Sequence, residues 1–356
     1  MAPVRKVLVV KLSSLGDVVH AMPAVQDLRR ALPGVHIDWV VERAFAPLVS
    51  RCDGVNRVIP CELRRWRKQL LSVQTRQAWR AFKADLHREA YDAVIDLQGL
   101  TKSALVSWLA RTTPQGQRFG MANQTEGSGF EAPARWVADT AIVLEPHVHA
   151  VQRARLLCAQ ALGYAPDAPL RFGLSGGSLA VEPLSSAAPA PSHLQGLTGN
   201  PFAPRKPVVA LVHGSSRADK QWPTASWIAL GQRLNHSGFT VALAHGNAAE
   251  KATSETIAKG LADAWVWPTM ALDALTDTMA RCAGVVGVDS GLSHIAVALG
   301  LPHVQIYNFD TAWRTGPMPS AAPRALRQVS VFASPYPDVE AVWQAWESLA
   351  TPVLCR

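Results

Sequence analysis

A single carboxylate stands where a buried strand gives way to a helix near the start of the chain. Val7–Val10 is a short apolar run typical of a strand in a parallel sheet, and Gly16 and Asp17 follow it after a few small and polar residues. Ligands of open α/β sheets bind at the carboxyl ends of such strands, so a carboxylate at this turn is well placed to act as a general base. An aspartate at a helix start also serves as a cap or a dipole partner, and the residues alone leave both roles open.

Three polar neighbours bear on the role of Asp17. Lys11 favours the ionised carboxylate, which suits a base, and Lys11, Ser13 and His20 can tune or orient it. His20 is an alternative base if it lies closer to the reacting hydroxyl.

A second candidate site lies in the run Gly284–Gly300, which reads as a strand, a Gly/Ser turn and a helix. Unpaired backbone N–H groups and a hydroxyl at that helix N-terminus form an anion site, which Gly291 lets a diphosphate approach closely. His294 lies about one turn into the helix and faces the same crevice. In the alternative interpretation Asp289 or Ser290 is a plain N-cap and His294 a structural histidine.

The loop His213–Pro223 lies at the carboxyl end of another apolar strand, the first of the second α/β series. Ser215 and Ser216 can bond phosphate oxygens, and Lys220 can neutralise the charge of a departing diphosphate. A solvated turn is the alternative.

A cluster of four cations surrounds Trp66 in the segment Cys61–Leu71. Arginine forks bind phosphate bidentately, and an aromatic side chain favours an interfacial position. An exposed basic helix end is the alternative; nucleic acid would be attracted equally by the charge, but no recognised nucleic-acid module accompanies it. The four cations are Arg64, Arg65, Arg67 and Lys68.

The excess positive charge lies in the first half of the chain. Of a formal net charge of +8, residues 1–165 carry 22 Lys/Arg and 14 Asp/Glu, whereas residues 166–356 carry 13 of each. Such a basic half attracts a polyanion or an anionic membrane surface.

Alternating strands and helices are expected to position these groups. With 356 residues, the chain is long enough for two α/β domains, and strands separated by helices of ordinary length predict parallel, doubly wound sheets. The strands are expected at Val7–Val10, His36–Val41, Val55–Ile59, Ala93–Leu97, Ala141–Leu144, Val208–Val212, Thr240–Ala244, Val285–Val288 and His303–Tyr307. The first helix is expected to carry Val25, Leu28 and Leu32, with Pro23 in its first turn. Further helices are expected around Gln69–His87, Thr101–Ala110, Val148–Leu162, Trp222–Leu234, Ala249–Leu261, Leu272–Cys282, Leu292–Leu299 and Val339–Leu349.

Composition changes divide the chain into four parts. We expect an N-terminal Rossmann-like domain (1–165), a Pro/Ser-rich linker or insertion (166–206), a C-terminal Rossmann-like domain (207–337) and a terminal helix (338–356). The five cysteines form no CxxC pair, which predicts free thiols in a reducing compartment. No signal peptide and no apolar run of about 18 residues is found, so we expect a cytoplasmic protein.

Several enzyme classes fit the sequence poorly. The first strand is followed by KLSSLGD rather than the GxGxxG of a Rossmann oxidoreductase, and GVDSG is not the GxSxG of a serine hydrolase. No DxD pattern occurs, so no residues are set aside for a divalent metal, and we expect no cofactor.

The motifs together resemble the lipopolysaccharide heptosyltransferases of glycosyltransferase family 9, over nearly all of the chain except 166–206. The similarity rests on VVKLSSLGDVVHAMPA, RRWRK, DLQGLTKSA, HGSSRADKQWP, HGNAAE and VDSGLSH. It implies a GT-B fold, in which two doubly wound Rossmann-like domains face each other across a cleft.

The resemblance also implies roles for residues. Asp17 falls on the family's catalytic aspartate. The donor would be held by Ser215, Ser216, Lys220, Asp289, Ser290, Gly291 and His294. Where relatives carry an acidic residue in the HGNAAE loop this chain has Ala248, and Asn247 or Glu250 is expected to replace it. The acceptor would meet Lys11, Ser13, His20, Arg64, Arg65, Arg67, Lys68, Gln98 and Lys102.

The implied activity is inverting, metal-independent transfer of heptose from ADP-heptose to a Kdo residue of Kdo-lipid A, with Lys220 neutralising the departing ADP. The partners are then these two substrates and the anionic inner-membrane surface, on whose cytoplasmic face the protein would lie, with no nucleic acid. RRWRK favours the family members that add the first heptose over those that add the second. A basic, non-enzymatic binding protein for anionic lipid or nucleic acid is the alternative from another class.

Overall fold

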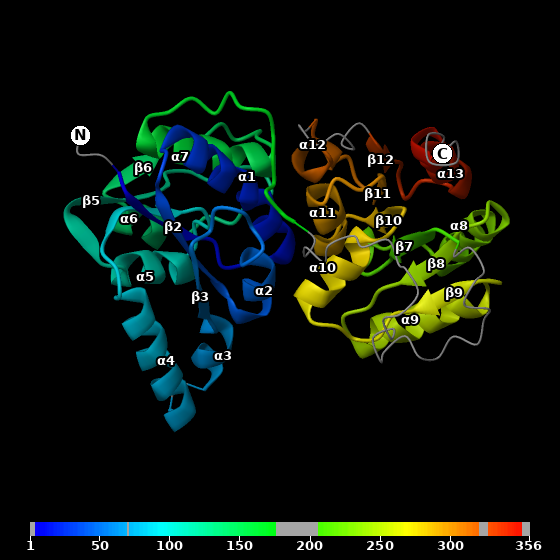
Figure 1. Ribbon diagram of the computed structural model, residues 1–356, viewed down its shortest axis with the longest axis horizontal. Coiled ribbons are helices and arrows are strands. Elements are labelled where there is room, and N and C mark those ends of the chain that lie inside the picture. Colours follow the sequence, from blue (N-terminus) through cyan, green and yellow to red (C-terminus); the bar gives the residue numbers. More distant parts are fainter. Residues whose placement is uncertain (1–3, 70, 176–205, 320–326, 351–356) are drawn as a thin grey trace, which may run out of the picture.

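Two six-stranded parallel sheets form the frame of the molecule (Figure 1). The computed structural model describes residues 4–69, 71–175, 206–319 and 327–350. The first sheet has the order β3-β2-β1-β4-β5-β6, and the second has the matching order β9-β8-β7-β10-β11-β12. The strand order therefore reverses between β1 and β4, and again between β7 and β10. These two reversal points are where open α/β sheets bind ligands.

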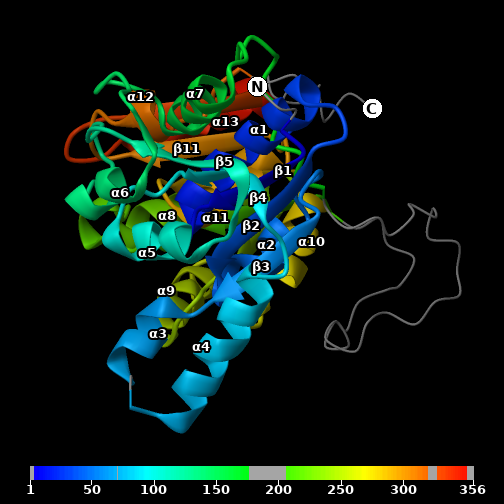
Figure 2. The same cartoon turned by 90° about the vertical axis from the view of Figure 1, so that its left-hand side faces the viewer.

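The N-terminal domain, called the front domain below, alternates strands and helices. Its strands are β1 (Lys6–Val10), β2 (His36–Glu42), β3 (Arg57–Cys61), β4 (Tyr91–Asp96), β5 (Thr112–Met121) and β6 (Thr140–Ile142). Its helices are α1 (Leu15–Ala31), α2 (Ala46–Val49), α3 (Leu63–Lys68), α4 (Val73–Leu86), α5 (Thr101–Leu109), α6 (Ala132–Val137) and α7 (Ala150–Leu162). Figure 2 shows α3 and α4 projecting from the body of this domain.

The C-terminal domain, called the rear domain below, has the same alternation of strands and helices. Its strands are β7 (Val208–Val212), β8 (Thr240–Leu243), β9 (Ala264–Val266), β10 (Gly284–Val288), β11 (His303–Tyr307) and β12 (Gln328–Phe332). Its helices are α8 (Thr224–His236), α9 (Ala248–Lys259), α10 (Leu272–Ala280), α11 (Gly291–Ala298), α12 (Ala312–Thr315) and α13 (Val339–Ala350). The last helix, α13, packs on α8, β11 and β12 of its own domain.

The central strands are buried because helices cover both faces of each sheet. Val7–Val10 and Gly284–Val288 have no polar side chain, which is typical of strands enclosed on both sides. Val7 pairs with Ala93, and Val286 with Leu211, so each reversal point is fixed in register by apolar residues. The polar residues that follow these strands are consequently held at one edge of each sheet.

The two domains meet where the N-termini of α1 and α11 pack together. A Cβ atom added at Gly16 would lie 2.7 Å from Cδ2 of His294, and one added at Gly291 would lie 2.7 Å from Cγ of Leu15. Glycine in each helix thus makes room for a side chain of the other. Arg51 of the front domain also pairs with Asp277 of the rear domain.

The α/β class and the pair of doubly wound domains are confirmed, and several details differ from expectation. Helix α1 begins at Leu15, so Pro23 lies inside it rather than in its first turn. The expected helix around Gln69–His87 is α4, and the basic run before it forms a separate short helix, α3, that was not expected. The edge or near-edge strands β5, β9 and β12 were not expected, because their short or polar runs lack the apolar pattern of buried strands.

The expected domain limits stay predictions. Most of the 166–206 linker, and Cys355, lie outside the described residues. The cysteines that are described, Cys52, Cys61, Cys158 and Cys282, are buried thiols, and burial raises the pKa of Cys52 to about 12. Within the described part of the chain, no helix has both the length and the apolar character that a bilayer span requires.

Candidate active site

Asp17 sits in the first turn of α1, at the reversal point of the front sheet. Its Oδ2 atom accepts hydrogen bonds from the backbone N–H of Ser14 at 3.0 Å and from Ser14 Oγ at 2.8 Å. Two cations face its other oxygen, with Lys11 Nζ 3.8 Å and an Arg153 nitrogen 3.7 Å from Oδ1. The side chain keeps 34% of its surface exposed, so the carboxylate is fixed and still open to a ligand.

The surroundings of Asp17 keep it ionised. Burial acts to raise its pKa, but Lys11 and the Ser14 hydrogen bonds outweigh this and hold the pKa well below its usual range. The group is therefore a carboxylate throughout the neutral range, in the form that accepts a proton. Capping of α1 is compatible with a general-base role, because Oδ2 makes the cap and Oδ1 faces the cations.

The loop between β1 and α1 is held in place from the β4 side. Gln98 Oε1 accepts hydrogen bonds from the backbone N–H groups of Leu12 and Ser13, at 3.2 and 3.1 Å. Lys11 Nζ donates to the carbonyl of Leu97 at 3.0 Å, and Ser13 Oγ accepts from Lys102 Nζ at 2.7 Å. Gln98 and Lys11, both expected at the acceptor, are thus engaged in positioning the loop that carries Asp17.

His20 is turned toward the rear domain. It is 6% exposed, and its ring centroid lies 4.2 Å from that of His294. Burial, followed by the neighbouring His294, lowers the pKa of His20 well below its ordinary value. A buried, neutral imidazole packed against the other domain is poorly placed to meet an acceptor hydroxyl, so the geometry favours Asp17 over His20 as the base.

At the reversal point of the rear sheet a second carboxylate is surrounded by donors. Lys220 Nζ lies 2.5 Å from Asp289 Oδ2, and His294 Nε2 lies 3.3 Å from Asp289 Oδ1. Thr315 Oγ1 donates to the same Oδ1 at 3.4 Å. Burial raises the pKa of Asp289, but His294 and Lys220 together hold it well below its usual range. Asp289 therefore orients Lys220 and His294 toward this edge.

Gly291 has a packing role in addition to the expected one at the donor, which stays a prediction. The close approach that this glycine permits is that of Leu15, whose Cγ atom occupies the place of a Cβ substituent. The expected anion site at the α11 N-terminus keeps its backbone N–H groups, with Ser290 as the N-cap residue. Packing against Leu15 of the other domain by itself excludes a side chain at this position.

A pocket of about 290 Å³ lies between the loops that follow β7 and β8. Its lining includes Ser215, Asn247 and Glu250, together with Trp222 and Trp227. Glu250 Oε2 accepts a hydrogen bond from the backbone N–H of Gly246 at 2.6 Å. The side-chain oxygen of Asn247 accepts from the backbone N–H of Glu250 at 2.9 Å and caps α9, which leaves Glu250 as the acidic group of the pocket. Ser216 is exposed on the same loop as Ser215.

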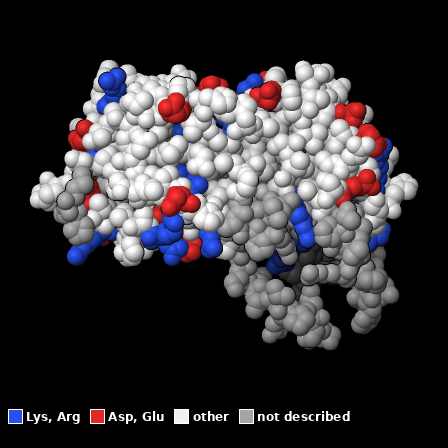
Figure 3. All heavy atoms as spheres, turned by 90° about the horizontal axis from the view of Figure 1, so that it is seen from above, with Lys and Arg blue, Asp and Glu red and all other residues white. Residues whose placement is uncertain are grey.

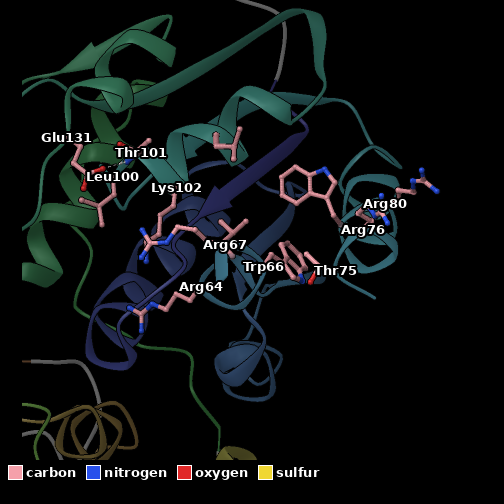
Figure 4. A pocket seen from close by; sticks show the side chains of 13 residues that line it. Arg64, Trp66, Arg67, Thr75, Arg76, Arg80, Leu100, Thr101, Lys102 and Glu131 are labelled. Atoms are coloured by element: carbon pink, nitrogen blue, oxygen red, sulfur yellow. Dashed lines mark hydrogen bonds between the residues drawn. The ribbon is translucent and has the colours of Figure 1, made fainter. Parts of the chain in front are cut away.

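A larger pocket, of about 860 Å³, lies between α3, α4 and α5 (Figure 4). Arg64, Arg67 and Lys102 line it, as the basic motif led us to expect, whereas Arg65 and Lys68 do not. Arg65 instead pairs with Glu62 at 3.3 Å. The apolar part of the wall is formed by residues that include Leu63, Trp66, Trp79, Leu100 and Leu105.

Three site residues escaped sequence reasoning. Arg76 and Arg80 line the larger pocket from α4, and their spacing of four residues in a segment without acids was the available signal. Arg153, on α7, carried no local signal, because only the fold brings it to Asp17. Among the described residues, no group of three or more His, Cys, Asp or Glu side chains is arranged to hold a metal ion.

Comparison with known proteins finds relatives that match most of the chain. Lipopolysaccharide heptosyltransferase 1 of Pseudomonas aeruginosa is 38% identical over 312 residues, which cover 87% of this chain and 81% of the relative. The structure of E. coli heptosyltransferase WaaC with ADP superimposes with a TM-score of 0.80 at 31% identity, covering 97% of this chain and all of that one. WaaC with ADP-2-deoxy-2-fluoro heptose gives 0.74 at 32% identity, covering 96% of this chain and 99% of that one.

The second heptosyltransferase is more distant. Lipopolysaccharide heptosyltransferase 2 of Escherichia coli K12 is 26% identical over 341 residues, which cover 92% of this chain and 89% of the relative. The family model of glycosyltransferase family 9 (heptosyltransferase) matches residues 79–338. An enzyme rather than a non-catalytic basic binding protein is thereby established: the chain belongs to glycosyltransferase family 9, the heptosyltransferases.

Proposed function

We propose that this chain transfers L-glycero-D-manno-heptose from ADP-heptose to a Kdo residue of Kdo-lipid A, with inversion at the anomeric carbon. The observation that carries the proposal is the pairing of two reversal points across one interface. The front one holds an ionised, partly exposed carboxylate, and the rear one holds a lysine and a helix N-terminus beside a pocket. The first supplies a base, and the second supplies positive charge for a leaving diphosphate.

Asp17 acts as the general base. It takes the proton of a Kdo hydroxyl as that oxygen attacks the anomeric carbon from the face opposite the diphosphate. One bond forms and the bond to the diphosphate breaks in a single displacement, which inverts the configuration. The flanking Lys11 and Arg153 hold the carboxylate in its ionised form and fix its direction.

The rear domain stabilises the leaving ADP. Lys220, Ser215 and Ser216 meet the diphosphate, and the N–H groups at Ser290–Gly291 complete the anion site. The pocket beside Glu250 has the size and polarity for the nucleoside, and its carboxylate is suited to ribose hydroxyls. The WaaC structures with ADP and with ADP-2-deoxy-2-fluoro heptose support this choice of donor. Because the sequence has no DxD pair and Lys220 supplies the charge, we propose that transfer needs no divalent metal.

The larger pocket receives the acceptor. Arg64, Arg67 and Lys102, with Arg76 and Arg80, offer cations to the phosphates of lipid A above an apolar wall. Such an acceptor lies in a membrane, so we propose that the protein works on the cytoplasmic face of the inner membrane and that the basic front domain (1–165) faces it. The domain 207–337 then holds the donor.

The decisive experiment measures turnover with ADP-heptose and Kdo-lipid A in the presence of a chelator. Asp17→Ala is expected to lower kcat by about 10²–10⁴-fold and to keep the Kd for ADP-heptose, because the base acts on the acceptor. Asp139→Ala, which removes an exposed carboxylate of the same domain, is the control. A variant Asp17→Ala that stays within threefold of the native rate contradicts the assignment.

Two further arms complete the design. Lys220→Ala should raise the KM for ADP-heptose and also lower kcat, since its charge matters most as the diphosphate leaves. Acceptor that already carries one heptose should be a poor substrate; if it is preferred over Kdo-lipid A, the chain adds the second heptose instead.

A further inference from the structure

We propose that the projection formed by α3 and α4 inserts the side chains of Leu71 and Val73 into the interface of an anionic lipid bilayer. The inference rests on the proposed function only in taking the acceptor to be a lipid. Leu71 is 92% exposed and Val73 is 56% exposed, although both are apolar. They lie at the turn where α3 gives way to α4, on the part of the front domain that projects from the body (Figure 2).

The charge of the projection complements an anionic surface. Residues 63–84 contain seven Lys and Arg and no Asp or Glu. All seven are exposed: Arg64, Arg65, Arg67, Lys68, Arg76, Arg80 and Lys83. The face of the molecule seen from above carries charges of both signs in small, scattered groups (Figure 3). The projection is thus a concentrated cationic surface around two exposed apolar side chains, which is the pattern of an interfacial anchor.

The pocket beside the projection has the same character. Lys102 and Leu105 line it from α5, and Trp108, one turn further along that helix, is 63% exposed. Tryptophan is enriched at membrane interfaces, where its ring lies at the depth of the headgroups. With Leu71 and Val73 in the bilayer, the pocket opens at the level of the headgroups. A lipid acceptor then reaches Lys102 without leaving the membrane.

A second copy of the chain is the other occupant to consider for exposed apolar side chains. Two projections packed against each other would bring together seven cations from each copy with no acids between them. Such like-charge contact is unfavourable, whereas each Lys or Arg near an anionic bilayer contributes favourably. The bilayer is therefore the occupant that the charges select.

The test measures binding to vesicles of phosphatidylcholine, with and without phosphatidylglycerol, in the absence of acceptor. Native protein should sediment with the anionic vesicles only. Leu71→Asp should weaken this binding about tenfold, because a carboxylate replaces an inserted side chain and opposes the anionic surface. Val143→Asp is the matched control, since Val143 is 71% exposed in the same domain but lies away from the projection. Equal losses in the two variants would overturn the proposal.

Kinetics separate this inference from the proposed function. Leu71→Asp should lower kcat/KM for acceptor embedded in vesicles about tenfold and leave the rate with a deacylated, water-soluble acceptor unchanged. If the native chain turns over the soluble acceptor but does not bind anionic vesicles, insertion is wrong and the transferase assignment stands. If native protein is dimeric and Leu71→Asp is monomeric, the projection binds a second copy and the membrane proposal is also wrong.

Discussion

Replacement of Gly16 by alanine tests whether the contact between α1 and α11 sets the geometry of the cleft. The new Cβ atom would lie 2.7 Å from Cδ2 and 3.3 Å from Nε2 of His294. The ring cannot swing away freely, because it is 5% exposed, packs on His20 and lies 3.3 Å from a carboxylate oxygen of Asp289. A normal contact between carbon atoms is about 3.5–4.0 Å, so the helices must part by about 1 Å.

The magnitudes predict a small effect on stability and a large one on rate. Alanine in place of a helical glycine stabilises by at most about 1 kcal/mol, whereas overpacking costs about 1–3 kcal/mol. The free energy of unfolding should therefore fall by about 0–2 kcal/mol. A displacement of about 1 Å between the base and the donor, in contrast, lowers the rate by up to about 100-fold. We expect kcat to fall between 10- and 100-fold, on the same principle.

The assay compares kcat, both KM values and the calorimetric Tm with those of Gly231→Ala. Gly231 lies in α8, and a Cβ there would also lie 2.7 Å from a side chain, that of Leu261, but within the rear domain. The control should change Tm by a comparable amount and leave kcat near the native value. Equal effects of the two variants on kcat would show that the contact between the helices does not govern the cleft.

Three further predictions concern the donor pocket, the acceptor pocket and pH. Glu250→Gln should raise the KM for ADP-heptose about 10- to 100-fold and leave the acceptor KM unchanged, since hydrogen bonds to a charged group contribute about 1.5–3 kcal/mol. An unchanged KM for ADP-heptose would show that Glu250 does not contact the ribose. The double variant Arg76→Ala, Arg80→Ala should raise the KM for phosphorylated acceptor about tenfold. Lys83→Ala, on the same helix but outside the pocket, should leave that KM unchanged. A rise in both variants would show that the net positive charge of the helix, rather than the pocket, attracts the acceptor. Burial lowers the pKa of His303 from its ordinary 6.5 to about 4, so between these values the unfolded chain binds a proton that the folded chain does not. This group should therefore lower the free energy of unfolding by roughly 2 kcal/mol as the pH is lowered from 8 to 5. In His303→Gln the free energy of unfolding, measured by denaturant titration at each pH, should depend less steeply on pH.

The strands around each reversal point could be predicted because their signals are local. Val7–Val10 and Val208–Val212 are apolar throughout, and the polar turn residues follow at once. Edge strands such as β12, with partly buried, alternating residues, lack that signal. The same distinction, between signals that are local in the sequence and contacts that only the fold creates, applies to the candidate site residues.

Asp17 and Lys220 could be proposed from the sequence because each lies in a motif beside its own strand. The partners that set their state come from elsewhere in the fold. Arg153 reaches Asp17 from α7, and Leu15 fills the space over Gly291 from the other domain. No periodicity or spacing announces a contact between segments so far apart in the sequence. The role of Gly291 between the domains accordingly had no signal in the sequence, and its expected role at a diphosphate stays a prediction.

Each carboxylate at the contact between the domains is paired with cations of its own domain. Asp17 faces Lys11 and Arg153 of the front domain, and Asp289 pairs with Lys220 of the rear domain. The contact between the domains at this point is instead made by the neutral His20 ring on His294 and by the two glycine packings. Separating the domains here consequently breaks no ion pair around either carboxylate, and the buried cations keep Asp17 ionised in both arrangements. Because desolvated charges are costly to leave unpaired, this division of charge lets the domains part here without leaving either carboxylate unpaired. We therefore expect kcat to depend on how Gly16 packs against His294, rather than on an ion pair between the two domains.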